Sequence, residues 1–416
     1  MPRHGISPSV LNSVLSTLVF STLRKKKTLF FNQVRGTTLM AQTNFAALLT
    51  HQKKVWAMDL WRQARAKMFL AKFIGKGHDS MIQHITELTK TTSGDQAVFH
   101  LIADLIEDGV TDDHILEGNE EAMKAYDQVI KIDQLRHATR NKGKMADQRS
   151  VITFRNNAKD GLAHWLADRL DQMAFLTLSG IKYTHENTGK LRSTKASGQM
   201  LKDLSFAADV TAPTDARHFR VKGNGLDIGD TSKITANDRL GYRHIVDLKA
   251  YAQDNYIRGV GAHNDKYHMF VTPRGLAQLK LDPDFLANAR SVNTGYKDNI
   301  LFAGTSDTLV VDGVYIHAYH HVFNTRAATA GGTGKEDGKK WGAGGAIDGQ
   351  RALFCGAQAL AIADIGPGEW EEDEFDYGNQ QGISYGKIFG LKKPVWQDKV
   401  SGKPQDFGVI CLDTAL

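Results

Sequence analysis

The chain carries a run of β-forming residues, Gln96-Ala-Val-Phe-His-Leu-Ile-Ala103, and later a second run with period-two alternation, Val129-Ile-Lys-Ile-Asp133. A long polar segment, residues 104–124, separates the two runs. The pattern of strand, polar excursion and strand predicts an extended hairpin. A loop of this length inside a compact domain is expected only where it has a role outside that domain. We therefore expect the tip of this hairpin to act beyond its own domain.

Further elements are indicated on the C-terminal side of the hairpin. Apolar residues recur at helical spacing over 157–178, and Gly180 stands at the expected stop, which predicts an amphipathic helix of about six turns. The other predicted elements are helices over 236–254 and 274–279, strands over 267–272, 308–311, 314–319 and 407–412, and a buried apolar stretch over 351–365. Residues 55–74 predict a short helix and an extended arm, and the Gly/Lys-rich segment 327–349 predicts an exposed loop. This mixture indicates an α+β fold.

Three patches of sequence resemble a known family. They are Leu116-Glu-Gly-Asn-Glu-Glu-Ala with the run from Asp127 to Ala138, Met269-Phe-Val-Thr-Pro-Arg-Gly-Leu-Ala-Gln-Leu-Lys-Leu-Asp-Pro, and Asp376-Tyr-Gly-Asn with Gly382-Ile-Ser-Tyr-Gly-Lys-Ile-Phe-Gly-Leu-Lys-Lys. In this order and spacing they resemble the major capsid proteins of tailed phages related to coliphage N-four. The resemblance implies the Hong Kong 97-type capsid fold and a major capsid protein that self-assembles, as pentamers and hexamers, into an icosahedral head shell around double-stranded DNA.

The resemblance also implies a domain organisation. A basic leader over 1–39 would precede an N-terminal arm over 40–95, the E-loop hairpin over 96–146, and a spine helix with the first part of the peripheral domain over 147–230. The axial domain would occupy 231–365, and residues 366–416 would return to the peripheral domain. The implied partners are other copies of the chain, a portal, scaffolding or decoration proteins, and packaged DNA bound without sequence specificity.

The charges near the hairpin change sign along the chain. Residues 104–121 contain eight acids and no Lys or Arg, whereas basic residues dominate 136–149. Two solvated surfaces would explain this contrast, and so would an acidic tip that meets a basic patch on a neighbouring subunit. The candidate inter-subunit contacts are Asp112, Asp113, Glu117, Asn119, Glu120, Glu121, Arg136, Arg140, Lys142, Lys144 and Arg149.

The net charge of the chain is concentrated at its N-terminal end. The whole chain carries +6, and residues 1–39 hold six basic side chains and no acid, so the remainder is neutral. The leader fits a transit peptide, a genuine basic arm inside the shell, or a segment absent from the mature protein if translation starts at Met40. The neutral body lacks the basic field of a protein that neutralises many phosphates. No apolar run is long enough for a membrane helix.

Candidate chemistry is sparse. On a strand, His317 and His321 would share one face, with His320 on the other, but no neighbouring ligand completes a metal site. The segment from Thr329 to Lys335 lacks the first glycine and the hydroxyl of a phosphate-binding loop. The acids at 369–374 are adjacent and mutually solvated, which does not separate their pKa values for catalysis.

We therefore expect no enzyme, no metal and no cofactor. A cellular nanocompartment shell of the same fold and a metal-dependent enzyme remain the alternatives. The two cysteines, Cys355 and Cys411, stand in apolar stretches as small buried hydrophobes would, which suits assembly in the host cytoplasm and a final location in the virion.

Overall fold

The computed structural model describes residues 50–86, 94–102, 108–121, 125–149, 154–193, 200–261, 265–291, 308–332, 338–397 and 402–416. The chain divides into two compact units, Met1–Ala47 and Leu48–Leu416, and every element below belongs to the second. The basic leader and the start site at Met40 lie outside the described residues. The α+β class is confirmed, because the described residues form both helices and mixed sheets.

A seven-stranded sheet organises one part of the second unit. Its order is β7-β6-β17-β11-β8-β10-β9. The strands are β6 (His218–Lys222), β7 (Gly225–Ile228), β8 (Tyr267–Val271), β9 (Thr308–Val311), β10 (Val314–Ala318), β11 (Gly349–Cys355) and β17 (Val409–Ala415). Pairs β8–β10 and β6–β17 are parallel, and the other neighbours are antiparallel. The last strand in the sequence, β17, lies inside the sheet, and all seven of its residues are buried.

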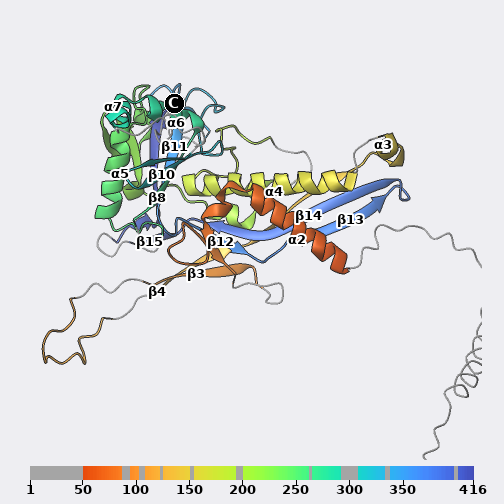
Figure 1. The fold of residues 1–416 in the computed structure, drawn as a ribbon, viewed down its shortest axis with the longest axis horizontal. Helices are drawn as coiled ribbons and strands as arrows, with labels where there is room; N and C mark the ends of the chain where they lie inside the picture. The colour runs from red at the N-terminus through yellow and green to blue at the C-terminus, as the bar shows by residue number, and fades with distance from the viewer. Residues whose placement is uncertain are drawn as a thin grey trace, which may run out of the picture. The chain divides into compact units, whose positions relative to one another are not determined.

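Three helices gather around this sheet (Figure 1). They are α5 (Tyr242–Asp254), α6 (Pro273–Leu281) and α7 (Pro283–Ser291). Apolar side chains of α5 and α6, such as Leu248 and Leu279, share one core with strand residues such as Met269 and Phe354. The hairpin predicted at Asp312-Gly313 is confirmed, since β9 and β10 are antiparallel and both turn residues have positive φ.

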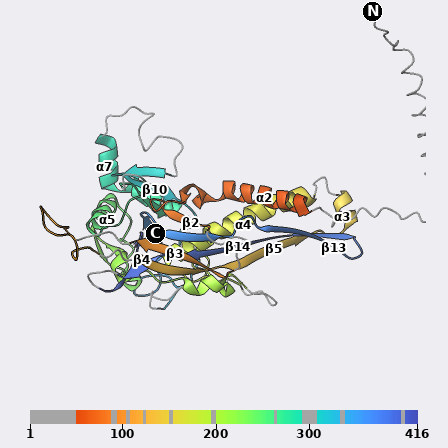
Figure 2. The same cartoon turned by 90° about the horizontal axis from the view of Figure 1, so that it is seen from below.

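The second sheet has six strands in the order β1-β2-β12-β14-β13, and β5 also pairs with β14. The strands are β1 (Ile74–Gly75), β2 (Ile82–Ile85), β5 (Asp133–Arg140), β12 (Leu360–Asp364), β13 (Glu369–Phe375) and β14 (Gln380–Lys392). Two helices, α2 (Thr50–Lys67) and α4 (Phe154–Ser179), lie against each other and against this sheet, as Figures 1 and 2 show. A short 3-10 turn, η2 (Phe69–Phe73), follows α2.

The predicted hairpin between the two β-forming runs is confirmed. Strands β3 (Gln96–Ile102) and β4 (Ala125–Lys131) pair antiparallel along their whole length. Phe99 and Ile130 bury against Ala361 of β12 in a small third core. The pairing with β3 ends at Lys131, and from Asp133 onward the chain joins β14 as strand β5. The strand pair β15 (Val395–Gln397) and β16 (Pro404–Asp406), the helix α3 (Lys144–Arg149) and the 3-10 turns η3 (Leu201–Asp203), η4 (Ser205–Asp209), η5 (Asp215–Arg217) and η6 (Thr231–Lys233) complete the described elements.

The long helix predicted over 157–178 is confirmed as α4. Gly180 ends it in the left-handed region at φ +68, with Gly180 N–H bonded to Thr177 O and Ile181 N–H bonded to Leu176 O. These two bonds form a Schellman motif, which satisfies the last carbonyls of the helix. The helix is less amphipathic than predicted, since every residue from Asp171 to Ser179 is buried. The stretch from Asp171 to Ser179 crosses the core and has no solvent face.

Three sequence expectations need correction. The helix predicted over 236–254 begins only at Tyr242, because Asp238 accepts hydrogen bonds from the Thr235 amide and hydroxyl and holds a turn there. A short helix and an extended arm were expected over 55–74, but the helix there, α2, is long and runs from Thr50 to Lys67. In the segment 327–349 the described residues are not uniformly exposed: Trp341 is only 3% exposed and pairs with Ile347. Glycines there permit close packing, since a Cβ on Gly349 would meet the Trp341 ring at 1.9 Å.

Candidate assembly surfaces

The tip of the β3–β4 hairpin carries acidic and apolar side chains that its own subunit does not bury. All residues from 111 to 120 are exposed. The backbone is held by local bonds: Asn119 N–H bonds to Leu116 O at 2.9 Å, and Gly118 N–H bonds to the Glu120 carboxylate at 2.8 Å. Ile115 and Leu116 keep 71% and 58% of their surface in solvent. Exposed apolar groups ringed by charge are typical of an interaction site.

The candidate acidic contacts all belong to this tip. Asp112, Asp113, Glu117, Asn119 and Glu120 are exposed, and Glu121 is half-buried. Asn119 is used locally, because its side-chain amide donates to Ile115 O at 2.9 Å. The exposed segment that carries Ile115 and Leu116 therefore also carries four exposed carboxylates, those of Asp112, Asp113, Glu117 and Glu120.

The candidate basic contacts lie on β5 and in the segment that follows it. Arg136, Arg140, Lys142, Lys144 and Arg149 are all exposed. Arg140 lies opposite Gly382 of β14, and its guanidinium stands 5.1 Å from the ring centroid of Phe375. Arg136 lies opposite Gly386, whose missing side chain leaves room for the arginine stem. The basic residues therefore run along the surface of the six-stranded sheet towards the β13–β14 turn.

The acidic tip and the basic patch are separated within one subunit. The tip joins β4 at Ala125, and Arg140 is at the far end of the next strand along the chain. At about 3.3 Å per residue, each of these two strands is roughly 23–26 Å long. Figures 1 and 2 both place the hairpin tip and α3 at opposite ends of the second unit. The two charged regions are therefore apart within one subunit.

A second exposed tip lies at the β13–β14 turn. Asp376, Tyr377 and Gly378 have φ values of 51, 48 and 80, and Asn379 N–H bonds to Asp376 O at 2.9 Å. This explains the sequence Asp376-Tyr-Gly-Asn379 as a left-handed turn. Tyr377 is fully exposed, and Phe375 is 40% exposed. A non-glycine aromatic at positive φ is uncommon and strained. Tyr377 is not among the contacts predicted from the sequence.

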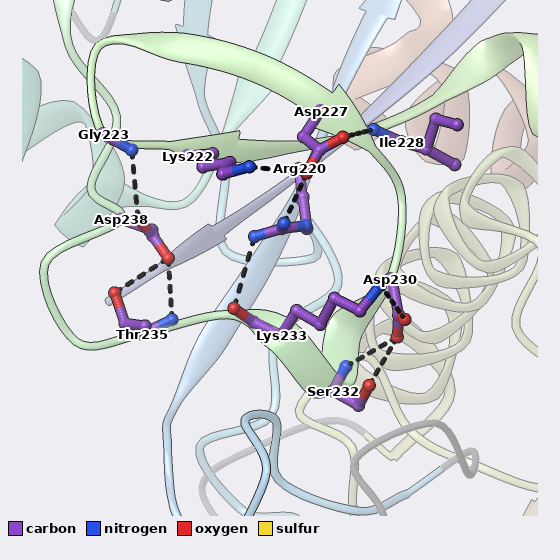
Figure 3. Close-up of polar contacts among 10 residues, drawn as sticks. All are labelled: Arg220, Lys222, Gly223, Asp227, Ile228, Asp230, Ser232, Lys233, Thr235 and Asp238. Carbon is purple, nitrogen blue, oxygen red and sulfur yellow. Dashed lines mark hydrogen bonds and ion pairs between the residues drawn. The ribbon is translucent and has the colours of Figure 1, made fainter.

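The edge strand β7 of the seven-stranded sheet is held by a network of charges, shown in Figure 3. Arg220 donates to Asp227 at 2.5 Å and to Lys233 O at 3.3 Å. Asp230 accepts from the Ser232 amide and hydroxyl, and Asp238 accepts from the Gly223 amide. The Ile228 amide, Arg220 and Lys222 lower the pKa of Asp227 despite its partial desolvation. Charged side chains on an edge strand oppose uncontrolled pairing with other strands.

The histidine cluster differs from its predicted arrangement. Strand β10 ends at Ala318 and the chain turns at once, with Val322 N–H bonded to Tyr319 O, so His317 and His321 do not share a strand face. His317 instead lies 3.1 Å from His268, and burial lowers the pKa of these two imidazoles to about 3 and about 4. His320 and His321 lie together beside Asp168 of α4. The expectation that His317 and His321 would share one strand face is wrong.

The remaining candidates have structural roles or lie partly outside the described residues. The acids of β13 pair with helices, since Glu371 contacts Lys53 at 2.5 Å and Glu372 contacts Arg155 at 2.8 Å. The phosphate-loop comparison over 329–335 includes residues 333–335, which lie outside the described ranges. Both cysteines are buried and free, as expected, and burial raises the pKa of Cys411 to about 12. None of the described helices is long and apolar enough to cross a membrane.

The second unit combines two mixed sheets, a long helix that is fully buried towards its C-terminal end, and exposed hairpin tips. Residues 31–416 match the family model described as phage capsid protein, so the chain belongs to that family. The resemblance found from the sequence patches is thereby confirmed, and so is the Hong Kong 97-type fold.

Individual relatives agree with this assignment. The chain is 48% identical over 377 residues to the major capsid protein of Pseudomonas phage KPP25, which covers 88% of this chain and 96% of the relative. Superposition on the capsid of Ralstonia phage GP4 gives a TM-score of 0.64 at 23% sequence identity. The match covers 92% of this chain and 97% of the GP4 chain. The capsid of cyanophage Pam1 has a TM-score of 0.61 at 19% identity, with coverages of 85% and 93%. These two structures are similar in fold.

Proposed function

We propose that this chain is the major subunit of a phage head, and that it self-assembles as pentamers and hexamers into the icosahedral shell around double-stranded DNA. The main observation that supports this proposal is the β3–β4 tip, where Ile115 and Leu116 lie exposed among carboxylates. Ordering such a segment costs roughly 1–2 kcal/mol per residue in backbone entropy. A neighbouring subunit that covers the tip offsets this cost only in the assembled shell.

The partner surface for the tip is the basic patch of another copy. Its members are Arg136, Arg140, Lys142, Lys144 and Arg149, and all are exposed. Opposite charges across such a contact favour the correct register and the rate of association more than the final affinity. The apolar pair Ile115 and Leu116 would supply the buried centre, with the carboxylates forming its polar rim. Repeated around a ring of subunits, one contact of this kind closes a pentamer or a hexamer.

The DNA inside would be held by confinement and without base-specific contacts. The chain from residue 40 onward carries no net charge, because its basic side chains are balanced by acidic ones. Its electrostatic attraction to the DNA phosphates is therefore weak. Portal, scaffolding and decoration proteins are the further partners. Assembly takes place in the host cytoplasm, and we infer that the protein has no enzymatic activity. The domain limits inferred from the resemblance also stay predictions. The cellular nanocompartment is the weaker alternative, because the 48% identical relative is a phage protein.

Electron microscopy of the purified chain tests the proposal. We expect closed shells whose subunits group in fives and sixes, with the 108–121 segment of each subunit covered by a neighbour. Deletion of residues 1–39 provides the control for the basic leader, and these shells should bind DNA weakly and in a salt-sensitive manner. A chain that stays monomeric under all assembly conditions, or shells in which the tip projects freely into solvent, would contradict the proposal.

A further inference from the structure

A group of metal-ligating side chains lies between α4 and the turn after β10. Asp168 of α4 and His320 and His321 of the turn each bring one ligand atom to within 4.8 Å of the others. Zinc in proteins takes carboxylate oxygen and imidazole nitrogen at about 2.0–2.2 Å. We propose that these three side chains bind a divalent transition-metal ion of the zinc class, with water in the fourth position.

The two oxygens of the Asp168 carboxylate face different residues, an arrangement that suits coordination of an ion by one oxygen only. Its Oδ1 lies 2.7 Å from His321 Nε2, and its Oδ2 lies 3.7 Å from Arg169 Nη2. Arg169 is itself fixed, because its Nη1 donates to Gln172 Oε1 at 2.6 Å. The arginine therefore stays on the Oδ2 side, and an ion can enter between Oδ1 and the imidazoles. The present hydrogen bond between Asp168 and His321 would be exchanged for two coordinate bonds.

The loop that carries the two histidines is held against the helix by Asn187. Its side-chain amide donates to His321 O at 2.5 Å and to Gln172 O at 3.2 Å. Such contacts fix the backbone from which the ligands project, as the outer contacts of metal sites do. The position of His321 is therefore set before any ion arrives. His320 is exposed, and its ring lies against the rings of Tyr319 and His321.

An unsatisfied polar atom points independently to a bound group. Asn187 is only 2% exposed, and its Oδ1 has no hydrogen-bond partner among the described residues. Asn187, His320 and His321 line one cavity of about 710 Å³. Buried polar atoms almost always have a partner. A water on the proposed ion would supply the missing donor to Asn187 Oδ1, which accounts for the orphaned oxygen and for the fourth coordination position together.

Zinc binding to the purified shell tests this site directly. Shells are dialysed against zinc sulfate and then against metal-free buffer, and the retained zinc is measured by mass spectrometry. We expect about one zinc per subunit and, with cobalt(II) in place of zinc, the visible spectrum of a four-coordinate ion. His320→Ala, His321→Ala and Asp168→Asn should each weaken zinc binding by at least about tenfold. Zinc should also raise the melting temperature of the parent in a concentration-dependent manner.

The matched control is His164→Ala, which removes an exposed histidine from the same helix. It should bind zinc as the parent does. His321 is buried and Asp168 is half-buried, so those variants could fail to fold, and His320→Ala then decides the question because His320 is exposed. Equal zinc retention by the parent and His320→Ala would overturn the proposal. A parent that retains no zinc would overturn it as well.

Discussion

Arg351 and Asp413 face each other on neighbouring strands and form a two-pronged ion pair in the core. Arg351 Nε lies 2.8 Å from Asp413 Oδ1, and Nη2 lies 3.1 Å from Oδ2. The third arginine nitrogen donates to Ser179 O, at the C-terminal end of α4, at 2.8 Å. His218 of β6 adds a contact to Asp413 at 2.6 Å. One guanidinium thus joins β11, β17 and the end of the long helix.

Arg351→Met should destabilise the subunit by about 3–5 kcal/mol, because it leaves Asp413 charged and buried without its main partner. Chemical denaturation of unassembled subunits measures the change. The matched control is Arg243→Met, since the Arg243–Asp284 pair is exposed and its atoms are 4.0 Å apart. That change should cost less than about 1 kcal/mol. Equal losses in the two variants would contradict a structural role for the buried pair.

The same pair predicts how stability depends on pH. Burial alone would raise the pKa of Asp413, but Arg351 and His218 outweigh it and lower the pKa to about 2. A depressed carboxyl pKa stabilises the fold above the unfolded value of about 3.9, and this contribution disappears as the pH falls towards 2. The stability gap between the parent and Asp413→Asn should therefore shrink across this window. Denaturation curves collected from pH 5 to the acid limit check it, and a constant gap would count against this prediction.

A second buried carboxylate connects α4 to the segment after α2. Asp171 accepts hydrogen bonds from the Phe69 and Leu70 amides at 2.7 and 3.1 Å, and from the Tyr319 hydroxyl at 2.9 Å. Asp171→Ala leaves these donors unpaired and should cost about 1–3 kcal/mol. Asp160→Ala, on the exposed face of the same helix, is the control and should lie within about 0.5 kcal/mol of the parent. Thermal unfolding of the three proteins distinguishes the outcomes.

Charge reversal tests the contact between the acidic tip and the basic patch. Glu117→Lys, Glu120→Lys and Glu121→Lys together should leave the subunit folded and reduce shell formation, since like charges across a contact cost roughly several kcal/mol. Adding Arg136→Glu and Arg140→Glu should restore assembly in part. Light scattering and electron microscopy measure the yield of shells.

The control for net charge reverses three exposed acids outside the tip, Asp247, Asp254 and Asp284. Its yield should exceed that of the tip variant. Normal yield and thermal stability of particles from the tip variant would show that the acidic segment is only a solvated surface.

Local sequence signals predicted the elements well. The recurrence of apolar residues before Gly180 predicted α4, the Asp312-Gly313 pair predicted the β9–β10 hairpin, and the two β-forming runs predicted β3 and β4. Each signal depends on neighbours in the chain, where helix and strand periods and turn residues are readable.

Contacts between distant residues could not be predicted in this way. Asp168 and His321 are 153 positions apart, and the spacing of residues around His320 did not reveal that a carboxylate of helix α4 lies beside the histidines. The burial of Trp341 was hidden in the same way, because a run rich in Gly and Lys is typical of loops whether or not a ring packs beneath it. Whether the acidic tip meets the basic patch of a neighbouring subunit depends on the surface of a second copy, which no local pattern encodes.

The central place of β17 has a consequence for the timing of assembly. Residues 409–415 lie between β6 and β11, so β6 pairs only with β7, and β11 only with β8, until β17 joins the sheet. Long-range pairing of this kind is slow because distant segments must meet before any contact stabilises them. Without β17 the strands form two separate groups, β7–β6 and β11–β8–β10–β9, so a chain in which β17 has not yet paired does not present the complete sheet.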